Sequence, residues 1–358
     1  LDAVRAGMIA LSRIDPVRYE SFFNKHLASE DIPTRALAVS CRALVPDRGL
    51  FETFRPFVND QESKIVLVAL NGLRRTPEGA KPEEGLVSYL RPSLTSPQED
   101  ILFAALDLLG KRAREEEFVE ALGLMAPVLS GSEKRVREAA ASALSRFCPP
   151  DLIGEIAIAQ GFGGSWLVVG PFPSDNKNKG FDEIFEPENN WNAPNYKAPY
   201  RWEFGGGNDE RELDLSWVET APENINGEVH LAAKMPVPVK YAVAYAKSRI
   251  KCDKKREVRF CFELREETAQ RVWLNGKEIA SFAVERNSLG GSVEQRRLGI
   301  PRQTKTMKVE LSEGVNELSF KSSTFGGDWR ISLRVLDTEK NRRADGISFL
   351  AYPKEKPE

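Results

Sequence analysis

The sequence predicts a multidomain α and β protein, in which an N-terminal α-solenoid of helix-pair repeats precedes a C-terminal antiparallel β-sandwich. A nine-residue block with apolar residues at helical spacing recurs five times before residue 145. All six tryptophans lie after residue 165, where short alternating and β-branched runs replace the segments rich in alanine and leucine. The length of 358 residues also suits two domains rather than one.

The recurring blocks read as amphipathic helices with a small residue in the middle, which lets two helices approach closely. Their final leucines are 33, 29, 36 and 35 residues apart. A second amphipathic segment begins between consecutive blocks, at Val17, Gly49, Gly85 and Phe118. Helix pairs repeating at this interval are typical of an α-solenoid. The five blocks are Ala3–Leu11, Ala36–Leu44, Ile65–Leu73, Ile101–Leu109 and Val136–Leu144.

These segments resemble HEAT or armadillo-type repeats, in pattern rather than in an invariant motif. The resemblance implies an elongated surface for contact with a partner protein. The array opens on the second helix of a pair, Ala3–Leu11, so we expect a helix to precede the chain in a longer protein. An irregular helical bundle stays open as the alternative.

The second part is rich in strand and turn signals. Asn275-Gly276 separates two apolar runs and predicts a β-hairpin, because a type I′ turn needs positive φ at both central residues. Trp166–Val169 predicts the first strand of the sandwich, which Pro171 and Pro173 are expected to end. The glycine cluster 161–164 predicts the linker between the two parts.

Five stretches of this part carry a resemblance: WLVVGPFP, GFD, VRFCFELREETAQRVWLNGKEI, VELSEGVNELSFKSS and DWRISLRVLD. Together they resemble the galactose-binding-domain-like jelly rolls of bacterial multidomain proteins, which include sugar-binding modules of glycoside hydrolases. The resemblance covers about residues 165–337 and implies a jelly-roll sandwich. Relatives often have an Asp-Asp-Gly-like turn where this chain has Glu266-Glu267-Thr268-Ala269-Gln270, so no acidic-pair metal site is expected there.

The predicted domains follow from these boundaries. Residues 1–161 form the helical repeats, residues 162–340 form the sandwich, and residues 341–358 form a C-terminal extension.

The sequence offers no convincing catalytic constellation. Its two histidines, His26 and His230, fall in different predicted domains, without cysteine or histidine at metal-ligand spacing. A G-x-S-x-G elbow and the phosphate-binding glycine motifs are absent. We therefore predict that the protein is not an enzyme and has no catalytic residue, no metal site and no cofactor.

A ligand site is predicted in the aromatic stretch WNAPNYKAPYRW, whose rings can stack on sugar faces while amides bind hydroxyl groups. Alternatively, these rings only cover the open end of the sandwich. A weaker candidate is the loop Gly326–Asp328, whose neighbour Trp329 is expected in the core. The predicted ligand-binding residues are Trp191, Asn192, Tyr196, Tyr200 and Trp202.

Charge and cysteine content limit the partners. Lys and Arg number 51 against 53 Asp and Glu, evenly distributed over the two parts, so a nucleic-acid partner is not expected. No apolar run is long enough to span a membrane. The four cysteines are expected to be unpaired, which favours a reducing compartment, whereas the jelly-roll resemblance implies an exported protein.

Three functions follow as hypotheses. The first is a non-catalytic scaffold whose helical repeats contact a partner protein and whose sandwich is a recognition module. The alternative is the carbohydrate-binding region of a larger exported carbohydrate-active enzyme. The third is a hydrolase in its own right, which requires convergent carboxylates in a cleft.

Overall fold

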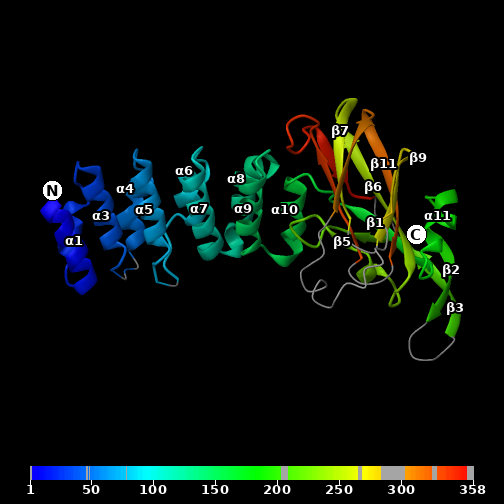
Figure 1. Cartoon of the computed structure of the whole chain (residues 1–358), viewed down its shortest axis with the longest axis horizontal. Coiled ribbons are helices and arrows are strands. Elements are labelled where there is room, and N and C mark those ends of the chain that lie inside the picture. The colour runs from blue at the N-terminus through cyan, green and yellow to red at the C-terminus, as the bar shows by residue number, and fades with distance from the viewer. Residues whose placement is uncertain are drawn as a thin grey trace. The chain divides into compact units, whose positions relative to one another are not determined.

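The computed structural model describes residues 2–45, 47, 49–77, 79–202, 209–264, 268–283, 303–324 and 329–352. Contacts divide the chain into two units, Leu1–Leu129 with Glu133–Leu152, and Ser130–Ser132 with Ile153–Glu358. The first unit is helical and the second contains antiparallel sheets (Figure 1), so the predicted fold class, a multidomain α and β protein, is confirmed.

The first unit consists of helices in series, and each of the five predicted blocks lies on one of them. Helices α1, α3, α5, α7 and α9 each pack on the next of this set, while α4 packs on α5 and α6 on α7. Assignment to a named repeat family stays a prediction. The helices are α1 Asp2–Ile14, α2 Glu20–His26, α3 Ile32–Arg42, α4 Leu50–Val58, α5 Ser63–Leu73, α6 Leu86–Leu94, α7 Glu99–Arg112, α8 Phe118–Ser130 and α9 Lys134–Ser145.

Small residues allow close helix contacts at the C-terminal ends of two of the blocks. A Cβ atom on Gly72 of α5 would lie 2.7 Å from the Cβ of Ala43 and 2.8 Å from the ring of Phe54. A Cβ on Gly110 of α7 would lie 3.0 Å from the carbonyl oxygen of Ala143. These positions therefore exclude larger side chains.

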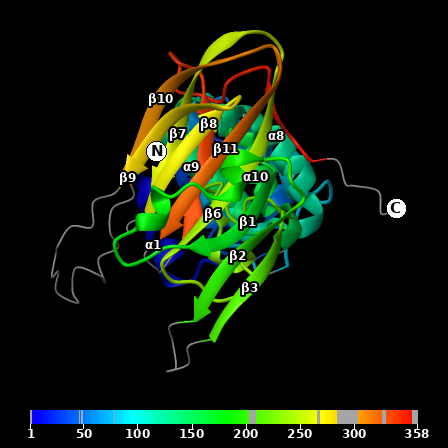
Figure 2. The same ribbon diagram turned by 90° about the vertical axis from the view of Figure 1, so that its right-hand side faces the viewer.

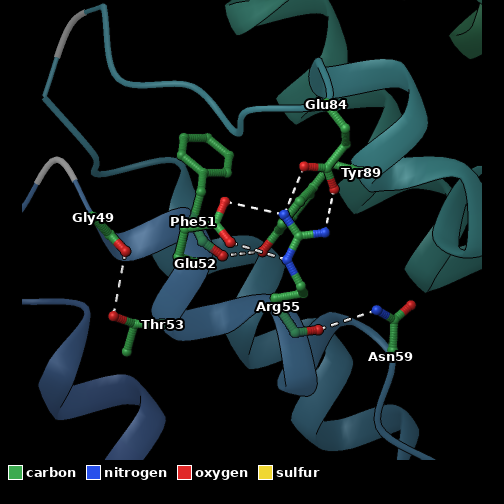
Figure 3. Close-up of polar contacts among 8 residues, drawn as sticks. All are labelled: Gly49, Phe51, Glu52, Thr53, Arg55, Asn59, Glu84 and Tyr89. Atoms are coloured by element: carbon green, nitrogen blue, oxygen red, sulfur yellow. Dashed lines mark hydrogen bonds and ion pairs between the residues drawn. The ribbon is translucent and has the colours of Figure 1, made fainter.

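Ion pairs connect segments of the first unit that are not adjacent in sequence. Arg55 on α4 bonds to both carboxylate oxygens of Glu84, with 2.6 Å from Nη2 to Oε2, and also to Glu52 (Figure 3). Thirty-six residues further along, Arg91 on α6 lies 2.8 Å from Glu120 on α8. Such solvent-accessible pairs add little stability.

The second unit contains a sandwich of two antiparallel sheets. It also contains two separate two-stranded sheets, in which β12 pairs with β5 and β2 pairs with β3. In the described residues, one sheet has the order β4-β1-β6-β11-β8-β9, with β14 also paired to β6, and the other has the order β10-β7-β13. The strands of these sheets are β1 Trp166–Pro173, β4 Val218–Thr220, β6 Ala242–Cys252, β7 Arg256–Leu264, β8 Thr268–Leu274, β9 Lys277–Ala283, β10 Gln303–Leu311, β11 Gly314–Thr324, β13 Leu333–Leu336 and β14 Ile347–Leu350.

The remaining elements of this unit lie around the sandwich. They are α10 Ile153–Ala159, α11 Glu186–Asn189, β2 Asn195–Trp202, β3 Asp209–Ser216, β5 Val229–His230 and β12 Arg330–Ile331.

The core between the two sheets takes every second residue of the strands. Phe260 and Phe262 of β7 pack against Phe320 of β11, and Trp166 of β1 packs against the same ring. Trp329 is fully buried here and its indole N–H donates to Ser322 Oγ at 3.0 Å, which confirms its predicted place in the core.

A predicted turn and a predicted strand end have different outcomes. The hairpin at Asn275-Gly276 is confirmed, with φ of 52° and 77° at its two central residues. The expectation that Pro171 ends the first strand is wrong, because β1 continues to Pro173. The register of β1 against β6 shifts between Val169 and Phe172, and such an irregularity accommodates a residue without an N–H group.

The outer face of the larger sheet is partly covered by the chain segment that contains α11, β2 and β3. Strands β2 and β3 form a hairpin alongside β1 (Figure 2). Tyr196, Ala198 and Leu215 of this hairpin pack on Val169, Phe172, Val243 and Tyr245 of β1 and β6. The first half of β6 is therefore buried on both faces, which explains its continuous apolar run Ala242–Ala246.

Candidate functional site

Three half-buried tryptophans meet on the outer face of the larger sheet. Trp191 follows α11, Trp217 connects β3 to β4, and Trp273 belongs to β8. The ring centre of Trp191 lies 6.5 Å from that of Trp217, with 26° between the planes, and 5.6 Å from that of Trp273. We call these three residues, with Lys247 of β6 and Tyr352 after β14, the tryptophan face.

The strand pattern places Trp273 on this face. Val272 and Leu274 belong to the core between the sheets, so the residue between them projects from the opposite side of the sheet. On that side Ser319 of β11 pairs with both Trp273 and Lys247, which puts the three residues in one row across β8, β11 and β6.

Lys247 lies beneath the indole rings. Its ammonium group donates to the carbonyl oxygen of Trp191 at 2.7 Å and lies 4.4 Å from the ring centre of Trp217. Only 8% of the residue is exposed, and this burial lowers the pKa of Lys247 below its ordinary value. The lysine therefore fixes the backbone of one tryptophan and contacts the ring of another.

A buried ion pair anchors the segment that carries Trp191. Lys321 of β11 is fully buried, and its ammonium group lies 2.8 Å from Glu188 of α11 and donates to the carbonyl of Glu183. The Tyr245 hydroxyl donates to the same carboxylate at 2.5 Å. Burial raises the pKa of Tyr245, so the phenol keeps its proton, whereas burial lowers the pKa of Lys321 and Glu188 opposes that shift.

Tyr352 and Arg249 form the edge of the tryptophan face beside β14. The guanidinium carbon of Arg249 lies 4.8 Å from the ring centre of Tyr352, and its Nη2 donates to the carbonyl of Ala351 at 2.6 Å. The Tyr352 hydroxyl is buried and has no hydrogen-bond partner among the described residues, and burial raises its pKa. The face thus combines aromatic rings with cationic and hydroxyl donors.

The predicted ligand-binding residues do not form one group. Trp191 lies in the tryptophan face, and Asn192 next to it is exposed. Tyr196 is only 2% exposed and donates its hydroxyl to the carbonyl of Asn190 at 2.8 Å, so its ring is not available for stacking. Tyr200 donates to the carbonyl of Pro238, away from the indole cluster. The side chain of Trp202 lies outside the described residues.

The weaker loop candidate Gly326–Asp328 and the pair Glu266-Glu267 also lie outside the described residues.

Prediction from sequence missed four members of this face, although two of them left a signal. Trp273 occupies an outward position in an alternating strand, and Lys247 is the first charge after the apolar run Ala242–Ala246 of β6. Both signals are local and visible in the order of the residues. Trp217 and Tyr352 reach the face only through long-range folding of the β2–β3 hairpin and of β14, for which no local pattern exists.

In the described part of the chain, the histidine and cysteine side chains outside this face are dispersed. His26 lies in the first unit, bonded to the carbonyl of Phe22, and His230 pairs with Arg330 between β5 and β12. In the described part of the chain, no three side chains from His, Cys, Asp and Glu gather as a metal site. All four cysteines are free thiols, as predicted. Within the same ranges, no helix has the length and apolarity needed to cross a membrane.

Comparison with known proteins does not identify a family for this chain. No protein-family model matches the sequence, and no curated protein matches it. Among solved structures, a family 35 carbohydrate-binding module from an environmental isolate is similar at 18% identity, over 32% of this chain and 74% of that module, with a TM-score of 0.22. A β-glucosidase from Kluyveromyces marxianus in complex with glucose is similar at 14% identity, over 49% of this chain, with a TM-score of 0.29. This match spans only 17% of the β-glucosidase, and TM-scores this low do not establish a common fold.

Proposed function

We propose that the second unit binds carbohydrate on the tryptophan face, without catalysing a reaction on it. The observation that carries the proposal is the meeting of Trp191, Trp217 and Trp273 from three distant segments, each ring half-buried rather than sealed in a core. Half-buried indoles have one apolar surface open to a ligand and are the residues that most often dominate binding free energy.

Two further features support saccharide as the ligand class. Among the described residues, the indole N–H of Trp217 donates to the Ala193 carbonyl, while those of Trp191 and Trp273 make no hydrogen bond within the protein. They are therefore available to hydroxyl groups of a ligand. The surrounding charged groups Lys247, Arg249 and Glu317 supply further donors and acceptors beside the rings.

Titration calorimetry of the full chain with a panel of neutral and acidic oligosaccharides tests this proposal. We expect measurable binding, and we expect Trp273→Ala to weaken it by about 2 kcal/mol, which is roughly 30-fold in Kd. The matched control is Tyr200→Ala, which removes a predicted aromatic outside the tryptophan face and is expected to leave Kd unchanged. If no saccharide binds, or if both variants lose affinity equally, the proposal fails.

We propose second that the first unit is a docking surface for a partner protein. The supporting observation is a stack of packed helices with an exposed apolar side chain, Val119 of α8, beside the Arg91–Glu120 ion pair. Val119 is 70% exposed, so its side chain is accessible to a partner.

Affinity capture with the wild-type chain and with Val119→Asp tests the second proposal. A partner that binds the wild type and is lost with the variant supports it. Capture that does not change with Val119→Asp, or capture of nothing, contradicts it. Far-ultraviolet circular dichroism should be the same for both chains, since the substituted side chain is on the surface.

A further inference from the structure

The outer face of the larger sheet buries two lysines in different electrostatic settings. Lys321 is fully buried and has a carboxylate partner, Glu188, at 2.8 Å. Lys247 is 8% exposed on the adjacent strand, and among the described residues no carboxylate lies within 4.0 Å of its ammonium group. Of these two neighbouring buried ammonium groups, only that of Lys321 therefore has a carboxylate counter-ion among the described residues.

The contacts of Lys247 within the protein do not replace a counter-ion. One hydrogen bond goes to the neutral carbonyl of Trp191, and the ring of Trp217 gives a cation–π contact. Glu317 attracts the ammonium group from a distance, while Arg249 repels it. The cation–π contact with Trp217 favours the charged form, but none of these contacts places an anion within 4.0 Å of the ammonium group among the described residues. A buried cation without an anion costs stability, which an arriving anion restores.

Other donors lie on the same part of the face. The ammonium group of Lys247 is 5.7 Å from the ring centre of Tyr352, whose buried hydroxyl bonds to no group in the part of the chain that the structure describes. The guanidinium group of Arg249 covers the same ring at 4.8 Å. An anionic oxygen in this region would meet an ammonium group, a guanidinium group and a phenol hydroxyl, all of which bind anions more strongly than neutral acceptors.

We propose that the ligand of the tryptophan face is an acidic saccharide, whose carboxylate or sulfate group pairs with Lys247 while its sugar rings lie against the indoles. This inference rests on the proposed carbohydrate binding and adds the chemical class of the ligand. Carboxylate and sulfate share the required chemistry, which is a delocalised negative charge on a sugar.

The test compares an acidic oligosaccharide with its neutral ester and with a sulfated oligosaccharide. Titration calorimetry of the full chain uses oligogalacturonate, the same oligosaccharide with its carboxyl groups methyl-esterified, and a sulfated galactan oligosaccharide. The free acid should bind tighter than the ester by about tenfold or more, because a charge-assisted hydrogen bond is lost on esterification. That advantage should shrink as NaCl rises from about 0.05 to 0.5 M. Preference between free acid and sulfated ligand identifies the anion.

Two variants assign the preference to Lys247. Lys247→Met keeps the apolar stem of the side chain and removes its charged end, so the acid and the ester should then bind within about twofold of each other. The control is Lys251→Met, which removes an exposed charge from the same strand and should retain the preference. The wild-type comparison of acid with ester needs no variant, so it stands even if Lys247→Met does not fold.

The outcomes separate this inference from the proposed function. Equal binding of the acid and the ester to the wild type overturns the acidic ligand and leaves carbohydrate binding in place. Binding of no saccharide in the panel overturns both. A preference for the acid that survives Lys247→Met but disappears in Lys251→Met assigns the anion to another part of the surface and contradicts the role of Lys247.

Discussion

At the residue scale, two glycines in similar helices have opposite surroundings. A Cβ on Gly72 would collide with Ala43 and Phe54, whereas nothing lies within 4 Å of a Cβ on Gly123 of α8. Gly72→Ala should therefore lower the free energy of unfolding by about 1–3 kcal/mol through overpacking. Gly123→Ala should raise it by up to about 1 kcal/mol, because alanine favours the helix.

Chemical denaturation followed by circular dichroism at 222 nm measures both effects. A gain of stability in Gly72→Ala would contradict the close packing of α5 on its neighbours.

The Lys321–Glu188 pair allows a second prediction at this scale. Glu188→Gln leaves a fully buried ammonium group without its anion and should cost about 3 kcal/mol or more. Adding Lys321→Met removes the uncompensated charge, so the double variant should recover most of the loss. A double-mutant cycle by thermal unfolding checks this coupling. Additive effects of the two substitutions would show that the ion pair does not anchor α11.

At the scale of single elements, helix α3 connects stability to pH. Its N-cap Asp31 accepts from the backbone N–H of Thr34 at 2.9 Å and pairs with Arg5 of α1 at 3.2 Å. Hydrogen bonds from Thr34, then the charge of Arg5, hold the pKa of Asp31 below its ordinary 3.8. The folded state thus favours the ionised form, and this stabilisation is present above pH 3.8 and lost as pH falls through the lower pKa of the folded state.

Asp31→Asn keeps an N-cap side chain but removes the titrating charge. We expect the stability of the helical unit to depend less on pH below 4 in this variant. Circular dichroism at 222 nm between about pH 2 and 6 measures the acid unfolding. Asp2, which is exposed and shares Arg5 as an ion-pair partner, is the control, and Asp2→Asn should change little. An unchanged acid profile in Asp31→Asn would contradict the contribution of the cap.

The elements also show what sequence alone can predict. Helical spacing and the Asn275-Gly276 turn are local, and both appear in the structure where they were predicted. The candidate site overlaps the predicted residues only at Trp191. Clustering of aromatics in the sequence singled out Trp191, but the same reasoning chose Tyr196, whose place on the inner side of β2 buries it. Which side of a hairpin meets the sheet depends on long-range packing.

At the scale of the whole molecule, the two units present different surfaces. The helical unit has packed helices joined by ion pairs such as Arg55–Glu84, and the second unit has the tryptophan face. Our account assigns carbohydrate recognition to this face alone. The central claim is therefore that indole rings of the second unit contact the ligand.

Nuclear magnetic resonance of the indole N–H groups tests this claim most directly, because the chain has six tryptophans in distinct places. On saturation with the saccharide that binds best in calorimetry, the signals of Trp191, Trp217 and Trp273 should shift. The signals of the core residues Trp166 and Trp329 should stay unchanged. Shifts confined to other tryptophans, or no shift at all, would contradict binding on the tryptophan face.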